Sequence, residues 1–577
     1  DKYPKMQVAT PCRSSWGANG YSEVWLNPSN DYVHKHLHVA GDRMCELANL
    51  YPDSKGWQKK ALNQCARELL LAQSSDWLFI ITNRFIFLLC LAATTSLSWA
   101  EGESYIIMDS LKYVLAEDNP GYCRIMDVDA GHRLPVTEDS TLVIPASVTI
   151  EGRTYEISDI ESDAFCNHLE IKHLIISEGI SGIQEGAFRR CANLKSIHLP
   201  SSLYCLNATS FAFCSRVEEI IVNKDNETFD SRDHCDAVIN TADSTLVLGC
   251  QRTKIPKGVT AIGQCAFMGR LYLDSLTIPE GVRRIESGAL RYCSGLRYLS
   301  LPESLESLGD LALDGCSNLQ KLHFSSSMRE IGHSVFSGCD GLREITVSPK
   351  NKWFDSREHC NAIIRTSEDS LVTGCGQSTI VEGIRRIGDD AFWGSSLSKI
   401  YIPSSVTYIG ERAFINSRFC SSIEVSPDNP VYDSRENCNA IIESATGILV
   451  KGCGRTVIPP DIKQIGGYAF HGMTMPKGLV IPEGVTDIGH SAFSGCDIHT
   501  LTLPASLRKI GNYAFNFCPW LETVEAESPE LYIGRSAFQF CYSLQSVRLP
   551  QTTIFADSEV FRYSLYQEIF EREYGRR

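Results

Sequence analysis

The stretch Val480-Ile481-Pro482-Glu483-Gly484-Val485-Thr486-Asp487-Ile488-Gly489-His490-Ser491-Ala492-Phe493 contains most of a motif that recurs along this chain. Counting from the proline, aliphatic residues follow three and six places on, and a small residue then Phe or Leu comes ten and eleven places on. The large residue recurs 22 or 23 positions apart, except across three longer gaps, at Phe165, Phe188, Phe211, Phe267, Leu290, Leu313, Phe336, Phe392, Phe414, Phe470, Phe493, Phe515, Phe538 and Phe561.

A fixed period of this length indicates a solenoid, because one unit cannot bury its apolar side alone and must share a continuous core with its neighbours. Within a unit, Leu194, Ile197 and Leu199 follow the spacing of a short strand with alternate residues inward. Stacked units would align these strands in a parallel sheet, and the arc that ends in Ala-Phe would return along the other side. We therefore expect a β-rich solenoid, with α+β character overall only because a small helical segment precedes it.

The repeated motif resembles the BspA-like, Treponema-type class of bacterial leucine-rich repeats, over roughly residues 101–563. The resemblance implies an array of leucine-rich repeat units over 164–563. It also implies a secreted or cell-surface, adhesin-like protein whose partners are extracellular proteins or glycans.

Charge and motifs argue against several other classes of function. The chain of 577 residues has 54 basic and 69 acidic residues and a net charge of −15, which disfavours nucleic acid as a partner. It contains no phosphate-binding loop, Gly-x-Ser-x-Gly elbow or His-Glu-x-x-His motif. Its 23 cysteines lack the Cys-x-x-Cys spacing of metal sites. We expect no enzymatic activity, no cofactor and no bound metal.

Residues 1–83 differ from the repeats and contain two helical patterns. They resemble the C-terminal helical region of the 1,4-alpha-glucan branching enzymes of glycoside hydrolase family 57. In that family the tryptophans matching Trp16 and Trp25 lie near the glucan, where an indole can stack on a sugar. Retaining glycoside chemistry needs two carboxylates about 5 Å apart, and the family's catalytic barrel is absent from this chain. Glucan branching is therefore the alternative function, with an inactive fragment as the expectation.

Residues 84–100 have the features of a secretory signal peptide. Arg84 precedes a short apolar run, and Ser98-Trp99-Ala100 supplies a cleavage site. A membrane-spanning helix is the competing interpretation, but a span needs about 20 apolar residues. We favour the signal peptide, which would leave residues 101–577 at the cell surface or secreted, without a membrane span. If the segment is not used, the protein stays in the cytoplasm. Its internal position suggests that two reading frames are joined near residue 84.

The two ends of the repeat array are expected to be capped. Residues 101–163 alternate apolar and polar positions between turn signals at Asn119-Pro120-Gly121 and Glu151-Gly152-Arg153, which predicts an antiparallel β cap over the first open edge. At the other end, residues 564–577 contain a short amphipathic run that forms a C-terminal cap or a truncated end.

The three longer gaps each add 33 residues with one shared pattern, an aromatic-Asp-Ser-Arg sequence followed by two cysteines that flank two apolar runs and a polar turn. This pattern predicts a β-hairpin insertion in each gap. Its ends would bring the two sulfurs close, either as a disulfide or as two buried thiols. Within each triplet we expect the Asp and Arg to form a local ion pair. The candidate disulfide cysteines are Cys235 with Cys250, Cys360 with Cys375, and Cys438 with Cys453.

A second group of cysteines occupies one repeat position, three places after the large residue. Stacking should place them in a column inside the core, where a thiol packs as a small apolar group and can donate weakly to backbone carbonyls. The group consists of Cys191, Cys214, Cys293, Cys316, Cys339, Cys496, Cys518 and Cys541.

With no catalytic constellation in the sequence, the expected functional element is the outward face of the strands. Extended solenoid faces bind macromolecules, and Tyr and Arg are frequent in protein interfaces. The alternative is that these polar residues only solvate the sheet. The candidate binding face comprises Lys195, His198, Arg297, Tyr298, Lys321, His323, Arg343, Lys399, Tyr401 and Arg548.

Overall fold

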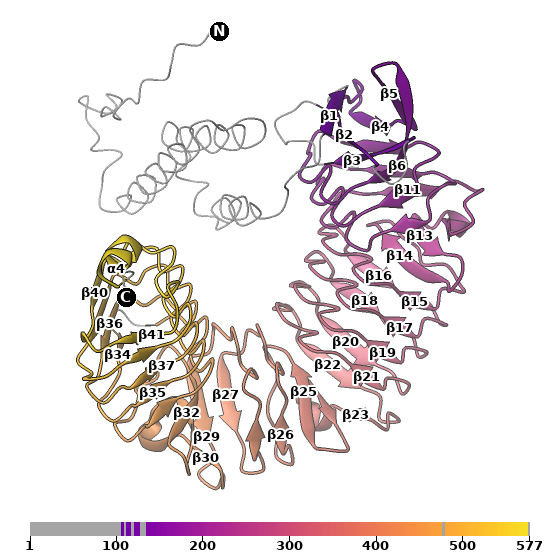
Figure 1. The fold of residues 1–577 in the computed structure, drawn as a ribbon. Coiled ribbons are helices and arrows are strands. Elements are labelled where there is room, and N and C mark those ends of the chain that lie inside the picture. Colours follow the sequence, from indigo (N-terminus) through magenta and orange to yellow (C-terminus); the bar gives the residue numbers. More distant parts are fainter. Residues whose placement is uncertain (1–104, 109–110, 117–120, 127–133, 476–478, 575–577) are drawn as a thin grey trace, which may run out of the picture. The chain divides into compact units, whose positions relative to one another are not determined.

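Two ladders of parallel strands run along a stack of coils in the computed structural model, which describes residues 105–108, 111–116, 121–126, 134–475 and 479–574 (Figure 1). All of these residues lie in one compact unit, Ser104–Arg577. Each coil contributes one longer and one shorter strand, so the predicted solenoid and its parallel sheet are confirmed. The N-terminal helical segment, the signal segment and the residues Trp16 and Trp25 lie outside the described residues.

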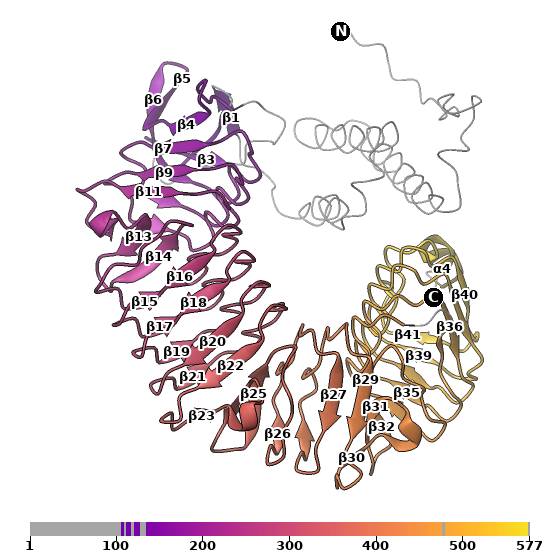
Figure 2. The same ribbon diagram turned by 180° about the vertical axis from the view of Figure 1, so that it is seen from behind.

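The longer strands carry the Leu-x-x-Ile-x-Leu signature and form four sheets, visible from both sides in Figures 1 and 2. Their inward residues alternate with exposed ones, as the period of two requires. The strands are β4 (Thr141–Ile144), β7 (His173–Ile176), β9 (Ser196–Leu199) and β11 (Glu219–Val222); β16 (Ser275–Thr277), β18 (Tyr298–Ser300), β20 (Lys321–Phe324) and β22 (Glu344–Val347); β27 (Lys399–Ile402) and β29 (Ser422–Val425); and β34 (Leu479–Val480), β36 (Thr500–Leu503), β38 (Thr523–Ala526) and β40 (Ser546–Arg548).

The shorter strands hold the second aliphatic position of the motif, just before its glycine. Between hairpins, each pairs in parallel with the equivalent strand of the next coil. They are β8 (Gly182–Ile183), β10 (Cys205–Leu206), β15 (Ala261–Ile262), β17 (Arg284–Ile285), β19 (Ser307–Leu308), β21 (Glu330–Ile331), β26 (Arg386–Ile387), β28 (Tyr408–Ile409), β33 (Gln464–Ile465), β35 (Asp487–Ile488), β37 (Lys509–Ile510), β39 (Tyr532–Ile533) and β41 (Ile554–Phe555).

The N-terminal cap is a small, mostly antiparallel assembly. Strand β2 (Leu111–Leu115) pairs antiparallel with β1 (Tyr105–Met108) and with β3 (Tyr122–Met126), and β5 (Ser147–Ile150) pairs antiparallel with β6 (Arg153–Ile160). Parallel stacking already begins inside the segment assigned to the cap, because β4 pairs with β7 and β6 with β8. The cap therefore covers the first coil and also supplies part of it.

Each of the three long gaps contains the predicted hairpin. A short strand leads through one turn of 3-10 helix into two antiparallel strands, and the second of these joins the ladder of shorter strands in parallel. The elements are β12 (Phe229–Asp230), η5 (Arg232–His234), β13 (Ala237–Asn240) and β14 (Thr245–Gly249); β23 (Phe354–Asp355), η6 (Arg357–His359), β24 (Ala362–Arg365) and β25 (Ser370–Gly374); and β30 (Tyr432–Asp433), η7 (Arg435–Asn437), β31 (Ala440–Glu443) and β32 (Ile448–Gly452).

The column of large residues forms the centre of the core, and all fourteen positions predicted from the period are buried. Where phenylalanines follow one another they stack face to face. Phe188 lies 5.0 Å from Phe165 and 5.1 Å from Phe211 between ring centroids, with nearly parallel planes. Phe470, Phe493, Phe515, Phe538 and Phe561 continue such a stack through the last coils.

After each hairpin, the first ring of the column packs against a glycine of the hairpin instead of against the ring of a preceding coil. A Cβ atom on Gly249 would lie 2.2 Å from a ring atom of Phe267, and one on Gly452 would lie 2.1 Å from the ring of Phe470. Gly374 stands in the same relation to Phe392, at 2.4 Å. Only a residue without a side chain leaves room for the ring there, so the sequence Gly-Cys ends every hairpin.

The core is divided into separate clusters, whereas the sequence predicted one continuous core. Among the described residues, the buried side chains form three clusters. Each of the first two hairpins has one face in the cluster before it and the other face in the cluster after it. Val238 packs into the first cluster and its neighbour Ile239 into the second. Adjacent strand residues point to opposite faces, so an inserted hairpin separates two cores.

Helix α4 (Gln567–Tyr574) follows the last coil. Tyr566 and Phe570 are buried against Phe561, the last ring of the column, at centroid distances of 5.2 and 5.1 Å. Among the described residues there is no helix with the length and apolar character needed to cross a bilayer.

A carboxylate connects successive coils at the corner that follows the proline. Glu483 accepts hydrogen bonds from the backbone N–H groups of Ala505 (2.9 Å) and Ser506 (3.2 Å) in the next coil. Glu382 accepts one from Ser404 at 3.0 Å. These backbone donors lower the pKa of both carboxyl groups below the usual 4.5, because they favour the charged form.

We expect the repeat array to lose stability in acid for this reason. A carboxyl group whose folded pKa is depressed contributes stability that is fully present above its unfolded pKa, about 4.5, and is lost as the pH falls through the folded value. Thermal unfolding followed from pH 7 to pH 3 should show this decline. In Glu483→Gln the decline should be shallower and the stability at pH 7 lower, whereas a pH profile identical to wild type would contradict the role of the carboxylate.

Candidate functional site

The residues of the predicted binding face lie on or next to the longer strands, with side chains outward. Nine of the ten are exposed and His198 is partly buried. The structure brings five of them together on the sheet β16–β22, where Tyr298 pairs with Lys321 across neighbouring strands. The other five lie on three further sheets, because each hairpin interrupts the ladder of longer strands. The five that share the central sheet are Arg297, Tyr298, Lys321, His323 and Arg343.

Neighbouring strands neutralise much of the positive charge on this face. Lys321 Nζ lies 2.6 Å from Glu344 Oε2, and Arg548 Nη1 lies 3.1 Å from Glu525 Oε1. Arg297 Nε is 3.6 Å from an oxygen of Asp274. Exposed pairs of this kind contribute little to stability, about 0–1 kcal/mol. On the central sheet, Lys321 and Arg297 are paired with acidic side chains, so it is not a strongly cationic surface.

The sequence interpretation missed an apolar row on the first sheet. Val143, Ile175 and Ile221 point outward and are 44%, 39% and 40% exposed. The strand register places Val143 beside Ile175, Ile175 beside His198, and His198 beside Ile221. The row therefore crosses all four strands. The signal available in the sequence was an unbroken run of aliphatic residues in these strands. In other repeats, aliphatic and polar residues alternate along the strand.

The paired cysteines of the hairpins are free thiols in the structure. Cys235 packs into the cluster after its hairpin and Cys250 into the cluster before it, so the two side chains lie on opposite faces. The same holds for Cys360 and Cys375. For these two pairs the two thiols pack into different clusters, and the disulfide alternative stays a prediction. Cys438 and Cys453 are also free and buried.

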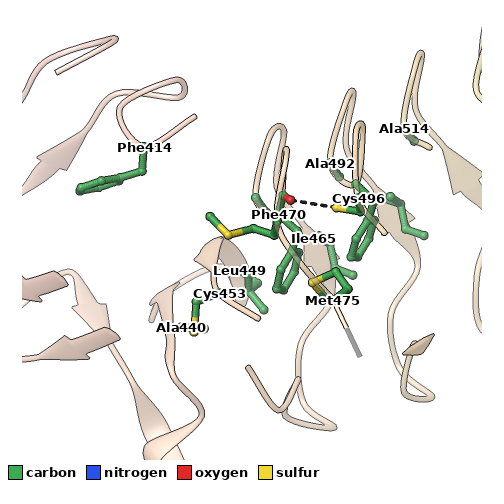
Figure 3. Packing of buried hydrophobic residues seen from close by; sticks show 14 of the residues in the cluster. Phe414, Ala440, Leu449, Cys453, Ile465, Phe470, Met475, Ala492, Cys496 and Ala514 are labelled. Atoms are coloured by element: carbon green, nitrogen blue, oxygen red, sulfur yellow. Dashed lines mark hydrogen bonds between the residues drawn. The ribbon is translucent and has the colours of Figure 1, made fainter. Parts of the chain in front are cut away.

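The other column of cysteines occupies its predicted place. Each thiol is buried and donates to the backbone carbonyl of the large residue one coil earlier, as Cys191 does to Phe165 (3.0 Å) and Cys496 to Phe470 (3.0 Å; Figure 3). Burial raises the pKa of the Cys293 thiol to about 12. The Cys293 thiol is therefore a packing group rather than a nucleophile. Within the part of the chain that the structure describes, no three His, Cys, Asp or Glu residues are grouped to hold a metal ion.

The Asp-Ser-Arg triplets form the expected local ion pairs. Asp355 and Arg357 are 2.7 Å apart, and Asp433 and Arg435 are 2.6 Å apart. Arg357 also reaches Asp369 at 2.9 Å, across the hairpin. The triplets hold the entry to each hairpin in place, and their charges are satisfied internally.

Comparison with family models identifies the repeats. The BspA type leucine rich repeat region matches residues 147–236, 248–362, 372–441 and 453–567, which is more than half of the chain. This chain belongs to the BspA type leucine rich repeat family. The gaps between the matched segments fall within the hairpins. Members of this family are typically cell-surface proteins.

Solved structures similar to this BspA-type protein include a leucine rich cell surface protein of Faecalibacterium prausnitzii, 24% identical, with 74% of this chain and 95% of the other covered and a TM-score of 0.38. The pneumococcal vaccine antigen PcpA is 16% identical, with coverage of 79% and 94% and a TM-score of 0.34. A leucine-rich repeat protein of Bacteroides ovatus is 20% identical, with coverage of 78% and 98% and a TM-score of 0.30.

The N-terminal region is similar to a different family. Residues 36–86 match the C-terminal domain of 1,4-alpha-glucan branching enzymes. A 1,4-alpha-glucan branching enzyme of Thermococcus kodakarensis is 33% identical over 78 residues, which is 14% of this chain and 11% of that enzyme. The similarity therefore spans a small fragment of an enzyme, whereas the BspA-type repeats, which indicate a non-enzymatic protein, make up most of the chain.

The BspA-type array also has a surface stack of aromatic rings that the sequence analysis did not find. Phe517, Phe540 and Tyr563 stack at centroid distances of 4.3 and 4.8 Å, and Phe517 is 44% exposed. Their φ angles are positive, at 54°, 61° and 63°, where bulky residues are strained. Equivalent positions in other coils, such as Gly472 and Gly495, hold glycine. The signal in the sequence was an aromatic residue two places after the column of large residues.

Proposed function

We propose that this protein is a non-catalytic, exported BspA-type repeat protein that binds an extracellular protein through the outward face of its longer strands, as an adhesin does. The apolar row formed by Val143, Ile175, His198 and Ile221 is the observation that carries the proposal. Family membership supports it, since leucine-rich repeat arrays serve protein interaction. The signal-like segment at residues 84–100 supports export.

The row has the chemistry of the centre of a protein interface. Val143 and Ile175 are direct neighbours, and His198 lies between Ile175 and Ile221, with about 5 Å from strand to strand. Glu219 and Lys195 lie near this row and provide a charged rim. Interfaces of soluble proteins combine a desolvated apolar core with such a rim. The balanced charge of the central sheet also argues for a protein rather than a strongly anionic partner.

Binding of the full-length chain to purified, immobilised extracellular-matrix proteins tests this proposal by surface plasmon resonance. We expect saturable binding, and the double variant Ile175→Ser/Ile221→Ser should weaken it about tenfold or more, because each tenfold corresponds to about 1.4 kcal/mol. Val457→Ser is the matched control, since Val457 is 72% exposed but lies outside the longer strands. Its binding should equal that of wild type.

Three results would contradict the proposal: absence of saturable binding to every matrix protein tested, equal binding by the double variant, or loss of binding when only the glycans of the matrix protein are removed. The last result would identify a glycan as the ligand.

Glucan branching is the second candidate, supported by the similarity of residues 36–86 to branching enzymes. Because the chain covers only 11% of the related enzyme, we expect the purified chain to leave the iodine stain of amylose unchanged. A fall in the stain with time, together with new α-1,6 branch points, would favour the enzymatic candidate instead.

A further inference from the structure

The position two places after the large residue forms a row that crosses the last coils. Backbone hydrogen bonds join successive coils beside it, from the N–H of Gly495 to the carbonyl of Asn516 (2.8 Å) and from that of Phe517 to Gln539 (2.9 Å). Every member of the row has a positive φ, between 54° and 72°. In chain order the row consists of Asn416, Gly472, Gly495, Phe517, Phe540 and Tyr563.

The row is open at Gly495. In an earlier coil the glycine of this position is buried under a ring, since a Cβ atom on Gly269 would lie 2.6 Å from Phe213. Gly472 is also buried, and a Cβ atom there would collide with Oδ1 of Asn416. Gly495 is exposed, and its Cβ would touch only backbone atoms of Gly472, at 3.7 and 3.9 Å. No side chain therefore covers this coil.

Phe517 forms one wall of the gap. One face of its ring stacks on Phe540 at 4.3 Å, with 19° between the planes. The ring is 44% exposed, and its second face is directed toward the preceding coil, where Gly495 has no side chain. A phenylalanine at a φ of 54° is strained, and burial of this second face does not offset the strain. Residues held in this way are frequent at binding sites.

Asn416 forms the opposite wall, and His471 orients its amide. Nδ1 of His471 lies 3.1 Å from Oδ1 of Asn416. Burial lowers the pKa of His471 to about 4, so the imidazole is neutral at pH 7 and its Nδ1–H can donate to this oxygen. The Nδ2 atom lies on the other side of the amide and remains as a donor to an oxygen of a ligand.

We propose that the gap at Gly495 binds one pyranose ring of a neutral glycan, with a face of the sugar stacked on Phe517 and a sugar hydroxyl accepting a hydrogen bond from Asn416. This site lies in the last coils, apart from the row of Val143, Ile175, His198 and Ile221 on the first sheet, and does not depend on the function proposed for that row.

The spacing of the coils fits a single ring. Gly472, under the amide of Asn416, and Phe517 are two coils apart, and strand-like coils lie about 4.8 Å from each other. A ring placed over Gly495 therefore lies about 4.8 Å from the ring of Phe517. This is close to the distance at which Phe517, Phe540 and Tyr563 already stack, so the bound sugar would continue the same column by one member.

The chemistry of the walls favours a sugar over other flat groups. The C–H groups on one face of a pyranose pack on an aromatic face, and its hydroxyls accept from an amide. Phe517, Asn416 and the neutral His471 carry no charge, and the net charge of −15 disfavours the bases of a nucleic acid. The side chain of a partner's phenylalanine would stack on Phe517 but would leave the donor of Asn416 unused.

Isothermal titration of the full-length chain with free cellohexaose, maltohexaose, mannohexaose and chitohexaose tests the site. We expect saturable binding of at least one of these sugars with a Kd of about 1 mM or lower. The double variant Ile175→Ser/Ile221→Ser should bind it as wild type does, so this experiment and the one on matrix proteins can fail separately. Absence of binding to all four sugars would overturn the proposal.

Two variants change the gap from opposite sides. Phe517→Gly gives the residue found at Gly495 and removes the strain, so the chain should fold, and affinity should fall about tenfold or more with loss of the stacking face. Gly495→Asn fills the gap with a residue that Asn416 shows to be compatible with a positive φ, and it should abolish binding although Phe517 is intact. Phe517→Tyr should retain binding.

Tyr292→Gly is the matched control, because it removes a ring from the same repeat position in a coil outside the gap. Its affinity for the sugar should equal that of wild type. The proposal would be wrong if Phe517→Gly or Gly495→Asn bound the sugar as tightly as wild type. It would also be wrong if N-acetyltryptophanamide displaced the sugar-free reference state with the same sensitivity to both variants while no sugar bound, since the site would then take an aromatic side chain.

Discussion

Replacement of Phe493 by alanine should lower the local free energy of unfolding by about 3–5 kcal/mol, the cost of removing a fully buried aromatic ring. Phe493 has no exposed surface, and its ring stacks on Phe470 at 4.9 Å and on Phe515 at 5.2 Å. The alanine variant loses both contacts at once and leaves a cavity in the middle of the column. Neighbouring rings are held by their own coils and cannot collapse into it.

The effect should be local, because each repeat contacts only its neighbours. Amide hydrogen exchange, which resolves stability along the chain, should show faster exchange in the coils on both sides of Phe493 and little change beyond the hairpin β30–β32. Phe517→Ala is the matched control, since that ring is half exposed at the end of the surface stack, and its cost should be clearly smaller. A uniform change along the chain, or equal costs for the two variants, would contradict the picture of a column shared from coil to coil.

Replacement of Asn226 by alanine should have a similar effect, about 3–5 kcal/mol, through hydrogen bonds rather than packing. Its side-chain amide donates to the carbonyls of Pro200 and Leu203, both at 2.8 Å. Its Oδ1 accepts the N–H groups of Thr228 (2.9 Å) and Phe229 (2.7 Å). Alanine would leave four buried backbone groups without partners, each costing about 1–3 kcal/mol, with partial relief from relaxation.

Asn226→Ala should lower the midpoint of thermal unfolding and speed hydrogen exchange in the first hairpin. Asn193→Ala is the matched control, because Asn193 makes one such bond, to the carbonyl of Leu169 at 2.8 Å, nearer the surface. Its effect should be about 1 kcal/mol. Asn351 and Asn429 make the same four contacts at the other hairpins. If Asn226→Ala behaved like Asn193→Ala, these asparagines would not be the anchors of the hairpins.

Much of the fold could be predicted because the period repeats one physical constraint many times. A single Phe at position 188 or 493 carries little information, but fourteen large residues that recur 22 or 23 positions apart, outside three longer gaps, require shared cores. The hairpins were predictable for a similar reason, since three copies showed the same order of aromatic-Asp-Ser-Arg, cysteine, apolar run, turn and apolar run. The role of the asparagine before each hairpin was not predicted, because its four partners lie in two coils.

Less of the candidate site could be predicted. The sequence placed Lys321 and Arg548 on the outward face, but it could not show that Glu344 and Glu525 on the next strands neutralise them. It assigned the face to polar and aromatic residues and missed the row through Ile175, because an aliphatic residue in a strand is usually inward. Only the register between strands showed that Val143, Ile175, His198 and Ile221 form one row across the sheet.

The sequence alone determined the period, the burial of the large residues, the place of the hairpins and the membership of the eight cysteines in one column, because each follows from spacing along the chain. The tertiary structure decided what lies across the stack: the division of the core at the hairpins and the row of outward residues on the first sheet. The physical reason is that spacing along the chain fixes the face to which a residue points, whereas its neighbour on that face comes from another coil. An inserted hairpin changes which coil supplies this neighbour.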